Sequence, residues 1–432
     1  MRVLVTGASG VFGREIVQRL VAGGHEVVGT SRRVPDGLPA GVRHVVADIT
    51  DADALGRAID GCDVVAHCAW AVGALHDDDA ERHINVGGTE AVLTAMAWVG
   101  ARRIVFASSS TAYGPRPAGL GVDEGTPLEP HPGHTYAVHK AEVEALLAGT
   151  DVDAVSIRSA VVLGRHIDNR IWSFMAAPVQ VDVKGRPATW QVVHADDVGR
   201  FFVQCCEGGP TGAVNLAAPG TFTAQDLAAA FDRRLVHVPE RVLRRGVQIL
   251  WDRQAFDVSP AEVDFIVGMP IMDTARLGDA FGFSCAWTAH EALEDTRLAV
   301  TGIVVAGPKV VELPWRTRYE RSPAVRPQGG WAAGVRRVGR AAGYGKDSQE
   351  LALHAARLER LAGDPTSLDD ARLTALIDLG ADLVAYGRGS VERPPSRRPV
   401  AHVRSLASID RTTAVLRTLE QERARRAADG LS

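Results

Sequence analysis

Tyr136 and Lys140 lie four residues apart in a stretch with helical periodicity, so their side chains should stack on one face of a helix. A nearby ammonium favours phenolate and lowers a tyrosine pKa from about 10 toward neutral pH, as acid–base catalysis requires. Ser109 ends an apolar strand pattern and can donate a hydrogen bond to a reacting oxygen. These three residues form the candidate catalytic set. By itself, however, a Tyr–Lys pair at this spacing is usually an exposed helix face.

A glycine-rich segment follows the first apolar run, Val3 to Val5. Gly7, Gly10 and Gly13 stand where a strand pattern turns into a helix pattern. They permit a tight turn, an approach of pyrophosphate to the backbone, and close packing of the helix on the sheet, respectively. A plain strand-to-helix turn is the alternative. The predicted dinucleotide contacts in this loop are Gly7, Ser9, Gly10, Val11, Phe12 and Gly13.

The end of the second strand pattern indicates which dinucleotide is preferred. Ser31, Arg32 and Arg33 stand where an acid would accept a hydrogen bond from the ribose 2′-hydroxyl of NAD. Hydroxyl and guanidinium donors suit the extra phosphate of NADP instead. The sequence therefore favours NADP over NAD, with a solvated basic loop as the alternative.

The elements that must position these groups alternate along the chain. Further short apolar runs stand at Val42 to Ala47, Val64 to His67, Ile104 to Ala107 and Ala154 to Ile157, with helical patterns at 80–99 and 136–148. Strands separated by helices predict an α/β fold with a doubly wound parallel sheet, the Rossmann arrangement.

The pattern changes after this first part of the chain. A stretch rich in Pro, Gly, Arg and Trp without periodicity indicates a linker, and helical pieces follow at 347–386 and 401–428. We expect a dinucleotide-binding domain over 1–303 with a small substrate lobe mainly at 165–190 and 222–300, a linker at 304–345 and a helical C-terminal extension at 346–432.

Composition limits the classes of function. The 432 residues are 46% hydrophobic, enough for a sizeable core. Five scattered cysteines fit neither a disulfide framework nor a zinc site, so we expect a reducing, cytoplasmic location and no metal. No leader and no apolar run long enough to span a bilayer is evident, so no membrane partner is expected.

The C-terminal extension raises the question of a partner. Residues 304–432 carry 22 Lys+Arg against 15 Asp+Glu. Acidic residues are interleaved throughout and no binding motif accompanies the arginines, so no nucleic-acid partner is expected. The amphipathic helices must bury their leucines against the body of the chain, a second subunit or a protein partner.

The motifs together resemble a known family. The combination of TGxxGxxG, a serine-rich strand ending in Tyr113-Gly114, YxxxK and Val193-His194-Ala195-Asp196-Asp197 is similar to extended short-chain dehydrogenases/reductases of the NAD-dependent epimerase/dehydratase type. The resemblance covers about residues 1–303. Asp48-Ile49, His67-Cys68-Ala69, Asn85 and Arg158 also match in order and spacing.

The resemblance implies roles for individual residues. Asp48 and Ile49 would contact the adenine, and Cys68 and Ala69 would lie beside the adenosine and ribose. Lys140 would also bind the nicotinamide ribose, while Tyr136 would pass the proton and Ser109 would polarise the carbonyl. Asn85 and Arg158 would hold the sheet and its loops rather than react. His194, Asp196 and Asp197 would serve either packing and helix capping or substrate contact, and they stand outside the catalytic set. By analogy, the family also suggests a homodimer through the helices at 80–99 and 136–148.

Departures from the family pattern narrow the reaction. Ser110 and Thr111 replace the Asp-Glu pair of the dehydratases, and only about thirty residues separate Gly164 from His194, which leaves little room for a sugar nucleotide. We therefore expect an NAD(P)-dependent oxidoreductase that interconverts a secondary alcohol and a carbonyl of a small molecule. A sugar-nucleotide epimerase is the alternative, and a non-catalytic dinucleotide sensor is a further one. Aromatic and apolar residues predict a hydrophobic pocket wall, or else lobe core: Trp70, Ile171, Trp172, Phe174, Met175 and Trp190.

Overall fold

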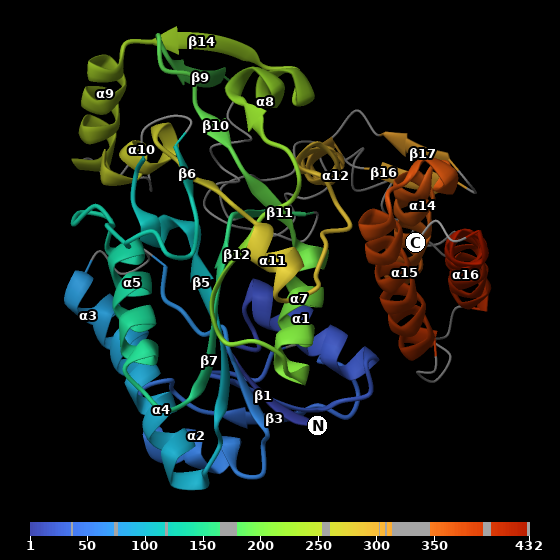
Figure 1. Ribbon diagram of the computed structural model, residues 1–432, viewed down its shortest axis with the longest axis horizontal. Helices are drawn as coiled ribbons and strands as arrows, with labels where there is room; N and C mark the ends of the chain where they lie inside the picture. Colours follow the sequence, from blue (N-terminus) through green and yellow to red (C-terminus); the bar gives the residue numbers. More distant parts are fainter. Residues whose placement is uncertain are drawn as a thin grey trace. The chain divides into compact units, whose positions relative to one another are not determined.

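Figure 1 shows the computed structural model of the chain. It describes residues 1–35, 38–72, 77–116, 120–164, 179–252, 260–301, 303–306, 309–312, 346–391 and 399–429. The chain divides into two compact units. The first consists of residues 1–283 and 287–293, and the second of residues 284–286 and 294–432.

A seven-stranded sheet forms the centre of the first unit (Figure 1). Its order is β12-β7-β5-β4-β1-β2-β3, and every neighbouring pair is parallel. The strands are β1 (Arg2–Thr6), β2 (Glu26–Ser31), β3 (Arg43–Val46), β4 (Val64–His67), β5 (Arg103–Ser109), β7 (Asp153–Ser159) and β12 (Gly212–Leu216). The strand order reverses between β1 and β4, so ligands are expected at the carboxyl ends of these strands. The predicted doubly wound Rossmann fold is confirmed.

Helices cover both faces of this sheet. On one face, α1 (Val11–Ala22) packs against α7 (Ala195–Glu207). On the other, α2 (Ala52–Ile59), α4 (Gly88–Val99) and α5 (Thr135–Ala148) bury apolar side chains against β1, β4 and β5. Because both faces are covered, central strands such as β4 are buried along their whole length, and in β4 only the last residue, His67, is polar. This burial produced the continuous apolar runs in the sequence.

Short irregular elements join the helices to the strand ends. A short helix, α3 (Asp78–Arg82), continues into the π-helix η1 (His83–Gly87) and then into α4. The 3₁₀-helix η2 (Ser110–Tyr113) follows β5 directly. Single π-helical turns within a helix, such as η1, are frequent at functional sites.

In the residues that the structure describes, the small lobe of the first unit consists of short pairs of strands and several helices. β9 (Val179–Val183) pairs with β14 (Arg234–Val238) beside α8 (Ala224–Ala230), α9 (Glu240–Asp252) and α10 (Pro260–Val267) (Figure 1). The remaining elements are β6 (Gly121–Val122) with β15 (Ile271–Met272), β8 (Val161–Leu163) with β11 (Val192–His194), β10 (Thr189–Trp190) with β13 (Phe222–Thr223), and α11 (Ala275–Asp279).

The predicted pocket wall is only partly described. Trp190 is buried, lies 5.7 Å from Phe222 between ring centroids, and donates from Nε1 to the carbonyl oxygen of Ile266 at 3.0 Å. It therefore packs in the lobe core. Ile171, Trp172, Phe174 and Met175 lie outside the described residues, and Trp70 is placed below.

The second unit contains the helical extension. It comprises the end of α12 (Ala289–Thr301), β16 (Ile303–Ala306), β17 (Lys309–Glu312), α14 (Lys346–Ala362), the 3₁₀-helix η4 (Pro365–Ser367), α15 (Asp370–Val391) and α16 (Pro399–Ala428). α14, α15 and α16 pack on one another. The apolar residues predicted to need a partner are buried in the structure: Leu351, Leu353, Leu358, Leu361, Leu373, Leu376, Ile377, Leu383 and Val384.

Two sequence expectations for this unit are corrected. The predicted linker begins with an antiparallel pair, β16 and β17, where no periodic structure was expected. The helical piece predicted at 347–386 is two helices, because Gly363 adopts a left-handed φ of 47° and Asp364 accepts a hydrogen bond from the Thr366 N–H. Glycine ends a helix readily in this conformation.

All five cysteines are free in the structure. No helix among the described residues is long and apolar enough to cross a membrane. The described part of the chain holds no cluster of His, Cys, Asp and Glu that could bind a metal ion. The cytoplasmic location and the homodimer stay predictions.

Candidate active site

The glycine loop between β1 and α1 leaves its backbone bare. Gly7 has a φ of 65°, and a Cβ placed there would lie 2.8 Å from the backbone of Ala69. A Cβ on Gly13 would overlap the carbonyl oxygen of Gly7. At Gly10, the N-cap of α1, no side chain bonds the free N–H groups, and no acidic residue stands in the first turn. We call the loop of Gly7, Gly10 and Gly13 the glycine cradle. It leaves space that side chains would otherwise fill, next to the uncapped N-terminus of α1, and this arrangement fits the pyrophosphate of a dinucleotide.

Buried hydrogen bonds hold the end of β4 against this loop. Thr6 Oγ1 accepts from the N–H groups of Cys68 and Ala69, both at 3.1 Å, and lies 2.8 Å from His67 Nδ1. His67 Nε2 lies 3.0 Å from Thr89 Oγ1, which itself donates to the Asn85 carbonyl. His67 Nε2–H therefore donates a hydrogen bond to Thr89 Oγ1, and His67 Nδ1 accepts one from the Thr6 hydroxyl. The network brings the predicted neighbours Cys68 and Ala69 to the glycine turn.

His67 is neutral in this network. Burial, and secondarily the charge of Lys140, lower its pKa from 6.5 to about 3. A neutral imidazole has one donor and one acceptor nitrogen, which matches one threonine on each side. No pattern in the sequence indicated this role of His67, although Thr6 directly precedes Gly7.

At the end of β2, the three residues predicted to select the cofactor are differently placed. Arg32 and Arg33 are exposed. The Ser31 hydroxyl donates to the Arg33 carbonyl at 2.7 Å and lies 2.9 Å from His44 Nε2. To donate to a 2′-phosphate, the Ser31 hydroxyl would have to give up its bond to the Arg33 carbonyl. The side chains of Arg32 and Arg33 are exposed and could bind the phosphate without such a change.

The predicted adenine contacts follow β3. Asp48 Oδ1 accepts hydrogen bonds from the N–H and hydroxyl of Thr50 at 3.0 and 2.9 Å. The Thr50 N–H bond is the main cause of the lowered pKa of Asp48. Ile49 packs against Gly88, where a Cβ would lie 2.8 Å from its side chain. Both residues thus have structural partners of their own, and their contact with adenine stays a prediction.

The three candidate catalytic residues are brought together by β5 and α5. Lys140 Nζ donates to the Ala107 carbonyl at 2.5 Å and lies 5.5 Å from the ring centroid of Tyr136. Ser109 Oγ accepts from the N–H and hydroxyl of Thr111 at 3.2 and 3.0 Å. The Ser109 hydroxyl proton is therefore free to be donated to another group, and Ser109 forms a hydrogen bond with the Tyr136 hydroxyl.

Burial and the neighbouring groups have opposite effects on the pKa values of Tyr136 and Lys140. Burial raises the pKa of Tyr136, and its hydrogen bond with Ser109 counteracts that rise. Burial also lowers the pKa of Lys140 well below its usual value, while Cys68 and Glu144 counteract the fall. Removal from water disfavours charge on both groups, so Tyr136 holds its phenolic proton more tightly than in water and Lys140 holds its ammonium proton less tightly.

Aromatic side chains surround Tyr136. Trp70 lies 6.2 Å away between ring centroids in an edge orientation, and the His134 ring stacks at 6.1 Å. Phe265 of α10 lies 6.0 Å from His134 and brings the small lobe to the site. Sequence reasoning included Trp70 but missed His134 and Phe265. Only the position of His134, two residues before Tyr136, could have indicated a role.

Beneath the site, a buried ion pair ties α5 to two strands. Arg158 of β7 bonds both carboxylate oxygens of Glu144, with Nη2 2.7 Å from Oε2. Ser108 donates to the same carboxylate, and the Tyr113 hydroxyl lies 2.8 Å from Arg158 Nη1. These contacts fit the structural role expected for Arg158.

The His-Asp-Asp segment also has structural partners. His194 Nδ1 accepts from the Asp196 N–H at 3.0 Å and caps α7. Asp197 binds Arg200 at 2.9 Å and accepts from the Trp287 N–H at 3.1 Å. The expected structural roles agree with these contacts.

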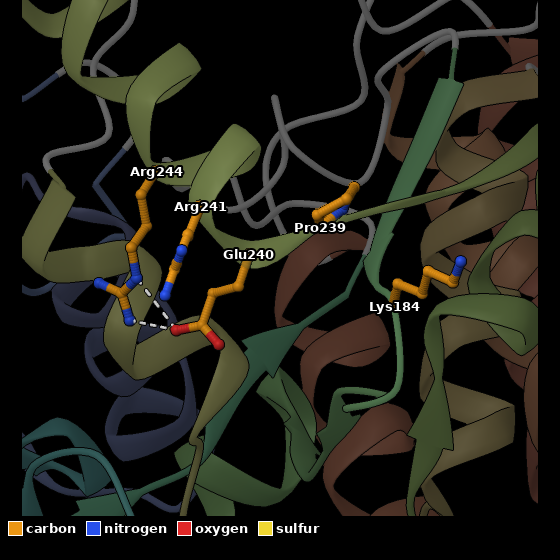
Figure 2. Close-up of a pocket in the computed structure, with 5 residues that line it drawn as sticks. All are labelled: Lys184, Pro239, Glu240, Arg241 and Arg244. Atoms are coloured by element: carbon orange, nitrogen blue, oxygen red, sulfur yellow. Dashed lines mark hydrogen bonds and ion pairs between the residues drawn. The ribbon is translucent and has the colours of Figure 1, made fainter.

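A separate hollow of about 510 Å³ opens on the small lobe and is lined by Lys184, Pro239, Glu240, Arg241 and Arg244 (Figure 2). Arg244 bonds Glu240 at 2.6 Å, and it also pairs with Asp264. Two carboxylates therefore compensate this guanidinium. None of the predicted site residues lines the hollow.

Comparison with known proteins identifies the family. Residues 3–217 match the NAD dependent epimerase/dehydratase family. A 3-diazoavenalumate denitrifying reductase of Streptomyces is 30% identical over 260 residues, which cover 56% of this chain and 84% of that protein. The chain belongs to the NAD-dependent epimerase/dehydratase family.

Two further similar proteins add to the comparison. A UDP-glucose 4-epimerase of Thermotoga maritima superposes with a TM-score of 0.56 at 19% identity, over 69% of this chain and 98% of that one. This likeness supports the fold. An uncharacterized protein of Mycobacterium tuberculosis is 39% identical over 331 residues, which cover 75% of this chain. The match spans only 33% of that relative's length.

Family membership supports the binding of NAD(P) by this chain, and the bare glycine cradle fits that group. The named relatives include reductases and epimerases. The choice between these reactions depends on the residues of the site itself.

Proposed function

We propose that this chain is an NAD(P)-dependent oxidoreductase that interconverts a secondary alcohol and a carbonyl of a hydrophobic small molecule. The observation that carries the proposal is the convergence of Ser109, Tyr136 and Lys140 at the carboxyl end of the sheet, beside the glycine cradle. Hydride exchange with the substrate carbon is the chemistry that bound NAD(P) supplies.

In the reducing direction, Tyr136 gives its phenolic proton to the carbonyl oxygen, so its O–H bond breaks as the alcohol O–H bond forms. Ser109 turns its single hydroxyl proton from the Tyr136 hydroxyl to the substrate carbonyl and polarises it. Only this proton is available, because Thr111 already occupies the acceptor sites of Ser109. The Lys140 ammonium stabilises the phenolate that remains. In oxidation, the phenolate takes the proton back.

The side chains around Tyr136 support a hydrophobic substrate. Trp70, His134 and Phe265 present aromatic surface on this side of the site. A wall of this kind favours an apolar or aromatic ketone over a sugar nucleotide with its charged diphosphate. The Streptomyces relative is named as a reductase, which agrees with this direction.

We also propose that NADP is preferred over NAD. The support is the pair of exposed guanidinium groups, Arg32 and Arg33, at the end of β2. Guanidinium binds phosphate with two charge-assisted hydrogen bonds. Calorimetric titration of the purified chain with NADP and NAD should give the lower Kd for NADP, and equal values would contradict the preference.

The reaction is tested with hydrophobic ketones and reduced NADP, by following the loss of cofactor absorbance. Tyr136→Phe should reduce turnover by about 10² to 10⁴-fold while cofactor binding persists. Tyr386→Phe, in the second unit, is the matched control and should retain full turnover. Unchanged turnover in Tyr136→Phe would contradict the assignment.

The same assay separates the alternatives. An epimerase would interconvert sugar nucleotides without net change in cofactor absorbance, because it returns the hydride to its substrate. A non-catalytic sensor would bind the cofactor tightly and convert neither class of compound. Oxidation or reduction of the ketones with matching consumption of cofactor supports the proposed activity.

A further inference from the structure

Trp70 is fixed in place by backbone bonds on both sides. The preceding residues, Cys68 and Ala69, donate their N–H groups to Thr6. The following residue, Ala71, donates its N–H to Asn85 Oδ1 at 2.8 Å and accepts from Asn85 Nδ2 at 3.0 Å. Asn85 is itself buried in the π-helix η1. The indole is therefore placed by the same buried network that forms the cofactor cradle.

The face of this indole covers the ammonium of Lys140. Nζ lies 3.4 Å from the centroid of the Trp70 ring and 4.6 Å from that of Phe106. Trp70 and Phe106 lie 5.7 Å apart, so the two rings form one aromatic surface. A cation at this distance from an indole face is attracted by the quadrupole of the ring, most strongly when water is excluded. Lys140 is only 3% exposed.

The other ionisable groups near Lys140 leave its charge without an ion-pair partner. Glu144, one turn further along α5, is held by Arg158 and Ser108. On the β4 side, His67 is neutral and burial raises the pKa of the Cys68 thiol to about 12. Tyr136, on α5 itself, is held as the phenol by burial. Among the described residues no carboxylate forms a salt bridge with Lys140. The groups that offset the desolvation of its ammonium are the Ala107 carbonyl, which accepts from Nζ at 2.5 Å, and the aromatic face of Trp70 and Phe106.

We propose that Trp70 is a positioning residue that keeps the Lys140 side chain charged and directed at Tyr136 through a cation–π contact. The importance of this contact for turnover rests on the proposed function. The contact itself does not, because it stands on the distances among Trp70, Lys140 and Phe106.

The composition of the chain allows a direct test. It contains only four lysines: Lys140, Lys184, Lys309 and Lys346. The full chain, labelled with ¹³C at lysine Cε, should give four resolvable NMR signals, and Lys140→Met assigns the signal of interest. A pH titration then reports the ionisation of Lys140 with no substrate or cofactor present.

Replacing the indole should weaken the charged state of Lys140. In Trp70→Leu we expect the Lys140 pKa to fall by about 0.5 to 1.5 units, and in Trp70→Phe by less. Trp98→Leu, which removes an indole that is 60% exposed on α4, is the control and should leave the Lys140 titration unchanged. An unchanged or raised Lys140 pKa in Trp70→Leu would overturn the proposal.

A second measurement remains informative if Trp70→Leu does not fold. Incorporating fluorinated tryptophan withdraws electron density from every indole face and hardly changes shape. It should lower the Lys140 pKa in the wild-type chain but not in Trp70→Phe, which lacks an indole at this position. Equal effects in the two proteins would overturn the proposal. If the Lys140 pKa falls as expected but the chain converts no ketone, the Trp70 contact is supported and only the proposed function is contradicted.

Discussion

Arg158 and Glu144 form an ion pair in which Nη2 lies 2.7 Å from Oε2 and each side chain is only 7% exposed. The pair joins β7 to α5, and the bond from Ser108 to the same carboxylate adds β5. Ser109 follows Ser108 on that strand, and Lys140 precedes Glu144 by one helical turn. One buried carboxylate therefore fixes the distance between the two elements that carry the candidate catalytic residues.

Breaking this pair should destabilise the first unit strongly. Glu144→Gln leaves the Arg158 guanidinium buried without its counter-charge, which costs about 3–5 kcal/mol. Glu142→Gln is the matched control two residues away, because Glu142 pairs with Arg82 near the surface and such pairs contribute about 1 kcal/mol or less. Urea unfolding monitored by circular dichroism measures both. Similar losses in the two variants would contradict the structural role of the buried pair.

The glycine cradle predicts a difference between two alanine substitutions. Gly7 and Gly24 both have left-handed backbones, with φ of 65° and 77°, so alanine at either position adds strain of about 1–2 kcal/mol. Only Gly7 faces Ala69, whereas a Cβ on Gly24 meets nothing within 4 Å. Calorimetry should show that Gly7→Ala loses cofactor binding and that Gly24→Ala keeps it. Intact binding in Gly7→Ala would argue that the cofactor lies elsewhere.

The arginines after β2 give a prediction about cofactor choice. Replacing Arg32 and Arg33 with alanine together should weaken NADP binding by about 10- to 100-fold, because a charge-assisted bond contributes about 1.5–3 kcal/mol. NAD binding should change much less. Arg57→Ala, an exposed residue of α2, controls for the general loss of positive charge. Equal losses for both cofactors would indicate an electrostatic effect unrelated to the 2′-phosphate.

His67 should make the stability of the chain sensitive to acid. Its pKa is about 3 in the folded chain and 6.5 in the unfolded one, so only the unfolded state takes up the proton as the pH falls below about 6.5. Stability is then lost on acidification at about 1.4 kcal/mol per pH unit.

His67→Gln removes this titration, because glutamine does not take up a proton in either the folded or the unfolded state. It should be less stable than the wild type at pH 7, where the bonds to Thr6 and Thr89 are lost, and the difference should narrow as the pH is lowered to 5. Urea unfolding at several pH values measures this, and the carboxylates common to both proteins cancel in the comparison. A difference that is constant with pH would show that His67 is protonated to the same extent in both states.

Local patterns in the sequence were enough to predict much of this protein. The apolar runs fixed the parallel sheet because strands buried on both faces leave no polar alternation. The spacing of Gly7, Gly10 and Gly13 placed a bare helix start after β1, and the spacing of Tyr136 and Lys140 put both on one face of α5. Each of these features depends on residues within one or two elements.

Other features required contacts between distant parts of the chain. The ammonium of Lys140 meets the indole of Trp70, seventy residues earlier, because β4 and β5 are neighbours in the sheet. The Ser31 hydroxyl is engaged by His44 through the pairing of β2 with β3. The apolar residues of the extension, for which the sequence left several partners open, are buried in the folded chain. Periodicity indicates that a side chain is buried. It does not indicate which residue that side chain contacts, because the contact depends on how strands and helices that are distant in the sequence pack together.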